Sequence, residues 1–187
     1  MISKKITVLL LIIFSWFLSG CTSTTMKNID TVKQVDLPRF MGDWYVIAAI
    51  PTMIETQSYN AIENYKLNAD GTIATTFTFY KGALDGPFKK YEPKGFVKPD
   101  TGNALWGMQF IWPIKAEYRI VYLDPEYQHT IIARNARDYV WLMARTPRIS
   151  DAEYKMLTEL IAGYGYDISK LRKVPQDWSK LPAKSSQ

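Results

Sequence analysis

The sequence predicts an all-β fold: an eight-stranded up-and-down antiparallel β-barrel with one C-terminal α-helix packed outside. Eight apolar or alternating runs of strand length follow one another along the chain, and residues typical of turns separate them. One segment near the C-terminus instead repeats its apolar residues at helical spacing. With 187 residues, of which 47% are hydrophobic, the chain can bury the core of one such domain.

Residues 1–20 have the layout of a secretory signal peptide. Lys4 and Lys5 precede an apolar stretch over residues 6–17, which is too short for an ordinary membrane-spanning helix. The Leu-Ser-Gly-Cys motif that ends at Cys21 matches the bacterial lipobox, in which the cysteine sulfur receives a diacylglycerol and the chain is cleaved before it. An uncleaved anchor with an incidental cysteine is the alternative. We expect lipidation at Cys21, since two or more acyl chains hold a protein firmly to a membrane.

The mature chain divides into three parts. Residues 21–34 are polar and predict a tether, residues 35–175 hold the barrel and helix, and residues 176–187 are expected to be a flexible tail. Thr22 follows the cysteine, where an aspartate would resemble the inner-membrane retention signal. The expected location is therefore the outer membrane of a bacterial cell envelope, with the lipid anchor as the membrane contact.

The charge distribution argues against a nucleic-acid partner. The chain has 23 basic and 18 acidic residues, and removal of Lys4 and Lys5 leaves 21 basic residues and a net charge of +3. Acids and bases are mixed along the chain rather than gathered in a patch, which is typical of a solvated surface rather than a polyanion site. Cys21 is the single cysteine, so no intramolecular disulfide can form and stability must come from packing.

The eight strands are predicted from alternation and turn residues. An Asn-Ala-Asp-Gly turn at residues 68–71 indicates a hairpin. Strict alternation in the first strand places Ala48 on the face of Trp44 and Val46, and alternation in the last strand groups Trp141 with Arg145. The predicted strands are residues 44–50, 59–67, 72–80, 88–98, 104–112, 116–123, 128–135 and 139–145.

The predicted helix begins after Pro147. The Ser-Asp-Ala-Glu sequence from Ser150 to Glu153 is typical of a capping box, and apolar residues at helical spacing follow for about twelve residues. Residues 167–174 are expected to add a ninth short strand.

Three separated motifs carry a family resemblance. A turn leads into the Gly-Asp-Trp sequence that holds Gly42 and Trp44, Asp124 follows the sixth strand, and Arg145 precedes Thr-Pro. Together they resemble the lipocalins, small barrels that carry hydrophobic ligands, and with the anchor they are most similar to the bacterial outer-membrane lipoprotein branch related to apolipoprotein D. In that family an arginine at the position of Arg145 lies across the tryptophan matching Trp44 and seals the narrow end of the barrel. The resemblance covers residues 35–175.

The expected ligand site is the barrel interior. Its aromatic side chains either fill a plain core or line a pocket, and the resemblance implies a pocket for a fatty acid or lysophospholipid. Loops at residues 50–55 and 112–115 carry apolar side chains and are expected to form the mouth. The predicted ligand-binding residues are Phe77, Phe79, Trp106, Phe110, Tyr118, Tyr122 and Trp141.

No catalytic residue, metal site or cofactor is predicted. His129 is the single histidine and is expected at the surface, without a second histidine or a cysteine to complete a metal site. Glu63, Glu92 and Glu117 are expected to point outward. Two other functions stay open, a binder of haem, retinoid or another pigment and an envelope lipoprotein whose barrel is packed shut. A homodimer also stays open.

Overall fold

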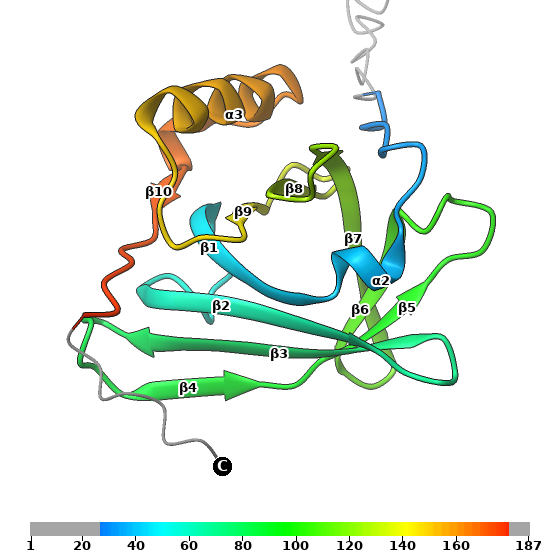
Figure 1. Ribbon diagram of the computed structural model, residues 1–187, viewed down its shortest axis with the longest axis horizontal. Coiled ribbons are helices and arrows are strands. Elements are labelled where there is room, and N and C mark those ends of the chain that lie inside the picture. The colour runs from blue at the N-terminus through cyan, green and yellow to red at the C-terminus, as the bar shows by residue number, and fades with distance from the viewer. Residues whose placement is uncertain (1–26, 180–187) are drawn as a thin grey trace, which may run out of the picture.

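A computed structural model describes residues 27–179 of the chain. The predicted signal peptide and Cys21 lie outside the described residues. The described strands form one antiparallel sheet that closes on itself, because β1 pairs with both β2 and β9 (Figure 1). The barrel strands are β1 (Gly42–Ile50), β2 (Ser58–Leu67), β3 (Thr72–Lys81), β4 (Phe88–Tyr91), β5 (Lys94–Val97), β6 (Leu105–Ile111), β7 (Ile114–Leu123), β8 (His129–Ala133) and β9 (Val140–Ala144).

The predicted eight-stranded barrel with an outer helix is confirmed. Apart from β4 and β5, each barrel strand pairs with its neighbours in sequence, which is the up-and-down order. The expected strand at residues 88–98 is divided into β4 and β5, which both pair with β3 and together occupy one barrel position. Pro93 lies at this break, where proline has no N–H to offer the ladder.

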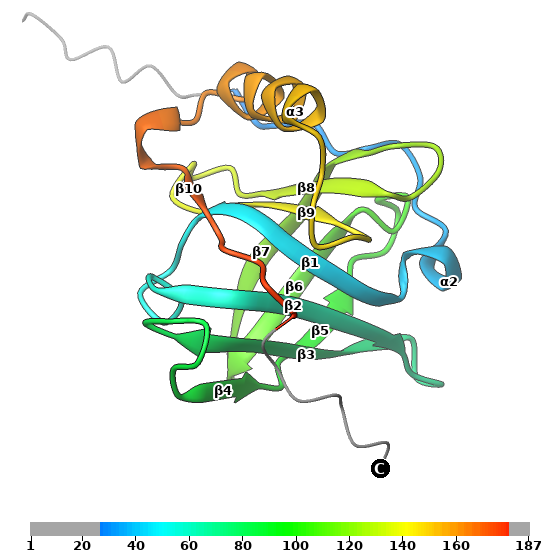
Figure 2. The ribbon, with the colours of Figure 1, turned by 60° about the vertical axis from the view of Figure 1, so that its left-hand side comes forward.

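Helix α3 (Asp151–Gly163) lies outside the barrel, across the side formed by β8 and β9 (Figures 1 and 2). The predicted capping box at its start is present: the Ser150 hydroxyl accepts from the Glu153 N–H, and the Glu153 carboxylate accepts from the Ser150 N–H. Leu157 and Ile161 are its buried residues and pack into the apolar layer beneath the helix. None of the described helices is long and apolar enough to span a membrane.

The buried apolar side chains form two clusters, one inside the barrel and one between the barrel and α3. The inner cluster fills the narrow end of the barrel and includes Phe40, Trp44 and Trp106. The outer cluster joins β1, β8 and β9 to α3. A strand buried on both faces therefore loses the simple apolar–polar alternation of a half-exposed strand.

The described part of the predicted tether is packed rather than free. Ile29 is 4% exposed, and its N–H donates to Asn135 Oδ1 over 2.9 Å. The Val32 N–H likewise donates to the Ile120 carbonyl over 2.9 Å. The prediction of a tether over residues 21–34 is thus too long, because apolar Ile29 and Val32 find partners on the barrel.

The predicted C-terminal tail also begins too early. The predicted ninth strand forms as β10 (Arg172–Lys173), which pairs with β1 at Ala48 and Ala49. Beyond it, the Gln176 side chain donates to the carbonyls of Val46 and Ala61, and Asp177 and Asn60 exchange hydrogen bonds. These contacts fix residues 176–177 to the barrel, while residues 180–187 lie outside the described part.

Candidate functional site

The barrel encloses a cavity of about 270 Å³ that opens at the end opposite α2 (Leu37–Phe40). The loop after β1 and the ends of β6 and β7 border its mouth, where Met53 is 88% exposed and Trp112 is 82% exposed. Residues 52–55 of the first predicted mouth loop line the cavity, whereas none of residues 112–115 of the second predicted loop is among the lining residues. The lining residues are Thr52, Met53, Ile54, Glu55, Glu63, Thr75, Phe77, Pro93, Met108, Phe110, Ala116, Glu117, Tyr118, Arg134, Tyr139 and Trp141.

Four of the seven predicted ligand-binding residues line this cavity. They are Phe77, Phe110, Tyr118 and Trp141.

Phe79 and Trp106 point inward as predicted but are fully buried in the inner cluster and do not line the cavity. Phe79 packs on Phe77 with a ring-centroid distance of 5.1 Å, and Trp106 stacks on Tyr118 at 4.9 Å. These two residues pack against two of the lining residues, Phe77 and Tyr118, within the inner cluster.

Tyr122 does not face the cavity, so its predicted inward orientation is wrong. The pairing of β7 with β8 shifts register between Ile120 and Tyr122, which marks a bulge. An extra residue at a bulge reverses the faces of the residues that follow it. Tyr122 therefore packs in the outer cluster, near the end of α3.

Ala48 is a second residue on the unexpected face. Register shifts between Val46 and Ala48 in the pairing of β1 with β9. Val46 and Ala49 consequently lie in the inner cluster, whereas Ile47 and Ala48 lie in the outer cluster with α3. Strict alternation fails here because one bulge exchanges the two faces.

Glu55 and Glu63 carry carboxyl groups at the cavity, and sequence reasoning identified neither as a cavity residue. Glu55 is 5% exposed and Glu63 is half-buried, and both line the cavity. The expectation that Glu63 points outward is therefore wrong. Its position in β2 alternates with buried Ala61 and Tyr65, so the pattern of the strand carried the correct signal. Glu55 lies in a loop, where no periodicity applies.

The two glutamates are held differently. Glu55 accepts from the Thr52 N–H at 3.0 Å, from the Thr52 hydroxyl at 2.8 Å and from the indole N–H of Trp141 at 3.1 Å. Burial raises its pKa above the ordinary value despite these hydrogen bonds.

Glu63 instead ends a chain of hydroxyl groups. The Tyr65 hydroxyl donates to Glu63 Oε2 and lies 2.7 Å from the Tyr118 hydroxyl. Burial raises the pKa of Glu63 to about 7, against the stabilising hydrogen bond from Tyr65, and the negative charge of Glu55 adds to the rise. The carboxyl of Glu63 thus changes charge near neutral pH.

The opposite end of the barrel is closed by the residues of the predicted signature. The guanidinium carbon of Arg145 lies 3.8 Å from the centroid of the Trp44 ring, the arrangement that the family resemblance implies. The same guanidinium donates to the carbonyls of Asp43 and Arg39, each over 2.8 Å. Gly42 adopts φ +93°, which places its backbone against the arginine.

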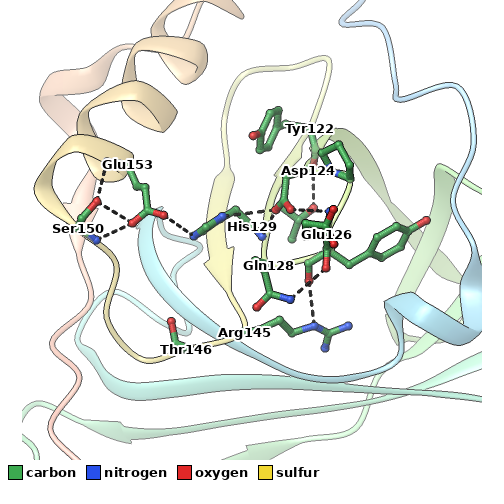
Figure 3. Close-up of polar contacts among 12 residues, drawn as sticks. Tyr122, Asp124, Glu126, Gln128, His129, Arg145, Thr146, Ser150 and Glu153 are labelled. Atoms are coloured by element: carbon green, nitrogen blue, oxygen red, sulfur yellow. Dashed lines mark hydrogen bonds and ion pairs between the residues drawn. The ribbon is translucent and has the colours of Figure 1, made fainter.

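Asp124 organises the turn that leads into β8. Its carboxylate accepts from the backbone N–H groups of Glu126 and His129. His129 is half-buried rather than freely exposed, with Nδ1 3.4 Å from Asp124 and Nε2 3.8 Å from Glu153 (Figure 3). These side chains join the closed end to the start of α3. Within residues 27–179 no three histidine, cysteine or acidic side chains are grouped to hold a metal.

Known proteins match the whole barrel. The lipocalin-like domain family matches residues 35–176. Temperature-induced lipocalin-1 from Arabidopsis thaliana is 34% identical over 87% of this chain and 90% of its own length, and the outer membrane lipoprotein Blc from Citrobacter freundii is 30% identical over 84% and 89%. The solved structure of insecticyanin from the tobacco hornworm Manduca sexta superimposes with a TM-score of 0.63 at 17% identity, over 82% of this chain and 86% of that one. With its closed eight-stranded barrel and matching domain, this chain belongs to the lipocalin family.

Proposed function

We propose that this protein is a lipid-anchored carrier of the bacterial cell envelope, which binds a fatty acid or lysophospholipid in its barrel to store, transport or repair envelope lipids. The observation that carries the proposal is the open cavity with a mainly apolar lining, formed by Phe77, Met108, Phe110 and Trp141 among others. Lipocalins in general bind small hydrophobic molecules and do not catalyse reactions. The cavity argues against a barrel that is packed shut.

The size of the cavity favours a slender ligand. A volume of about 270 Å³ lies just below the range of roughly 300–1,000 Å³ that is typical of small-molecule pockets. A single flexible acyl chain fits such a space better than a broad rigid ring system such as haem. An absorbance spectrum of the purified protein without a visible chromophore band would support the lipid over a pigment.

The mouth offers one cation to an anionic head group. Arg134 lines the cavity, and its Nε is buried without a hydrogen-bond partner among the described residues, although Asp138 Oδ1 lies 3.3 Å away. A carboxylate or phosphate placed at the mouth would be attracted by the positive charge of this guanidinium. This supports binding of a fatty acid with its tail inward and its head toward Arg134.

The envelope location is proposed from the sequence motif and from the relatives. The Leu-Ser-Gly-Cys motif ends at Cys21, and several bacterial relatives are named outer membrane lipoproteins. The apolar rim of the mouth, with Met53 and Trp112 exposed, suits a barrel that exchanges lipid with a nearby membrane.

Filling the cavity should abolish ligand binding. Ala116 lines the cavity from β7, so Ala116→Trp places an indole in the space that the acyl chain would occupy. We expect the affinity for a fluorescent fatty acid to fall at least about tenfold, which corresponds to about 1.4 kcal/mol. Fluorescence titration of the delipidated protein measures the change, and circular dichroism checks that the variant is folded.

Lys115→Trp is the matched control for the cavity variant. Lys115 is the preceding residue of β7 and lies outside the barrel, with its ammonium 3.5 Å from the centroid of the Phe96 ring. This variant should bind the fatty acid as tightly as the parent protein does. Tight binding by a folded Ala116→Trp variant would mean that lipid binds elsewhere.

Replacing Cys21 by serine should prevent lipidation, because serine lacks the thiol to which the diacylglycerol is transferred. We expect the precursor to remain unprocessed and unlabelled by radioactive palmitate in a bacterial host, whereas Thr24→Ser should be processed and labelled normally. Palmitate label on the Cys21→Ser protein would disprove anchoring through this residue.

A further inference from the structure

One carboxyl oxygen inside the cavity has no described partner. Among residues 27–179, the Tyr65 hydroxyl is the one donor to Glu63, and it bonds to Oε2. The Tyr118 hydroxyl lies 2.7 Å from the Tyr65 oxygen and can donate a hydrogen bond to it, because the Tyr65 hydroxyl hydrogen is already directed to Glu63. Glu63 Oε1 is thus left as an acceptor in the cavity that Glu63 lines.

Each of the other charged groups of the lining either lies close to an opposite charge or accepts hydrogen bonds from neutral donors. Glu117 Oε1 lies 2.6 Å from Arg119 Nε, and Arg134 Nε lies 3.3 Å from Asp138. Glu55 is bonded to Thr52 and Trp141. The charge that remains without a counterion in the inner cavity is therefore negative when Glu63 is ionised.

A cation would compensate this charge, whereas an anion would be repelled by it. The surroundings of Glu63 also suit a cationic nitrogen. Phe77 lies directly opposite Glu63 in the β2–β3 ladder, and Phe77 and Trp141 both line the cavity. Aromatic rings attract an ammonium group through their faces, and they accept the apolar body that carries it.

We propose that Glu63 is the anchor of a second ligand class, amphiphiles that carry a cationic nitrogen on an apolar body and enter the barrel nitrogen first. The inference rests on the proposed function, because it uses the same cavity. It adds a charge preference that a fatty acid does not share. Fatty acids would bind with the carboxylate at Arg134, and alkylammonium ions would bind with the nitrogen at Glu63.

Three probes with the same twelve-carbon chain separate these possibilities: dodecylammonium, dodecanol and laurate. Each displaces a neutral fluorescent naphthylamine from the parent protein. Near pH 8 we expect dodecylammonium to bind roughly 10–100-fold more tightly than dodecanol, which is the effect of one charge-assisted hydrogen bond. Between about pH 6 and about pH 8 its affinity should rise, since the pKa of Glu63 is about 7 and alkylammonium stays protonated.

Glu63→Gln keeps the shape and a hydrogen-bonding group but cannot ionise. This variant should lose most of the preference for dodecylammonium, about tenfold or more, and should bind dodecanol unchanged. Glu117→Gln is the matched control, because it removes a lining carboxylate that Arg119 already pairs. An equal loss in both variants would show a diffuse charge effect and would overturn the role of Glu63.

The outcomes distinguish this inference from the proposed function. If the parent protein binds the neutral probe and laurate, and Ala116→Trp blocks both, the carrier function stands. Equal affinities for dodecylammonium and dodecanol in the parent protein would then refute the cationic-ligand inference alone, even if Glu63→Gln failed to fold. If neither the probe nor any twelve-carbon ligand bound the parent protein, both proposals would fail.

Discussion

Replacing Trp44 by alanine is expected to lower the free energy of unfolding by about 3–5 kcal/mol, as for other fully buried large aromatic side chains. Trp44 is 0% exposed, its ring lies 5.1 Å from the Phe40 ring, and its indole N–H donates to the Phe40 carbonyl over 2.9 Å. The substitution therefore leaves a cavity at the closed end of the barrel and removes a buried hydrogen bond. Urea denaturation followed by circular dichroism measures the loss.

Trp112→Ala is the matched control, since it makes the same substitution where the side chain is 82% exposed. We expect it to change the free energy of unfolding by less than about 0.5 kcal/mol, as is usual for surface positions. Similar losses in the two variants would mean that the closed end does not carry the stability assigned to it.

The contact between Trp44 and Arg145 can be measured separately. Arg145→Ala should cost about 2–3 kcal/mol, because the guanidinium stacks on the indole and donates to carbonyls of Arg39, Phe40 and Asp43. In a double-mutant cycle the two substitutions should be coupled by about 0.5 kcal/mol or more. Additive losses would contradict an energetic role for the cation–π contact.

The fold was predictable because its signals are local and repeated. Turn residues at 68–71, the capping box at Ser150 and strand-length apolar runs each report on a few neighbouring residues. Eight such runs in series, followed by one helix, leave few arrangements other than a closed meander with a helix on its surface.

The faces of individual residues were less predictable, because one bulge changes the face of everything that follows it. Neither Ile47-Ala48 nor Val121-Tyr122 contains glycine or proline to mark the register shifts that the structure shows there. Ala48 and Tyr122 were misplaced for this reason.

Glu63 was misplaced although it lies in a regular part of its strand, where alternation holds. Its prediction as outward-facing used only the usual exposure of carboxylates, whereas alternation with buried Ala61 and Tyr65 indicates an inward position. Buried carboxyls are uncommon unless a site requires them, so a glutamate on the apolar face of a strand is a useful sign of a ligand site.

The cavity residue Glu63 should make the protein less stable as pH rises from about 5 to about 8. Its pKa is about 7 in the folded protein against an ordinary value of 4.5, so between these values the folded protein retains a proton that the unfolded chain has released. Raising the pH therefore favours unfolding. The full difference corresponds to about 3 kcal/mol, at 1.36 kcal/mol per pKa unit. Urea denaturation at a series of pH values measures this slope.

Glu63→Gln isolates the contribution of this carboxyl, because glutamine does not titrate. The variant should show a flatter stability profile and should exceed the parent protein in stability above about pH 7. Some slope should remain, since burial also raises the pKa of Glu55 and gives it the same sign.

Glu92→Gln removes a carboxyl that is 65% exposed and ion-paired with Lys90, so its profile should follow that of the parent protein. If Glu63→Gln and the parent protein had parallel profiles, Glu63 would be ionised with an ordinary pKa in the folded barrel. The interior of the cavity would then be more hydrated than its apolar lining implies, and the carboxyl would already be solvated without a cationic ligand.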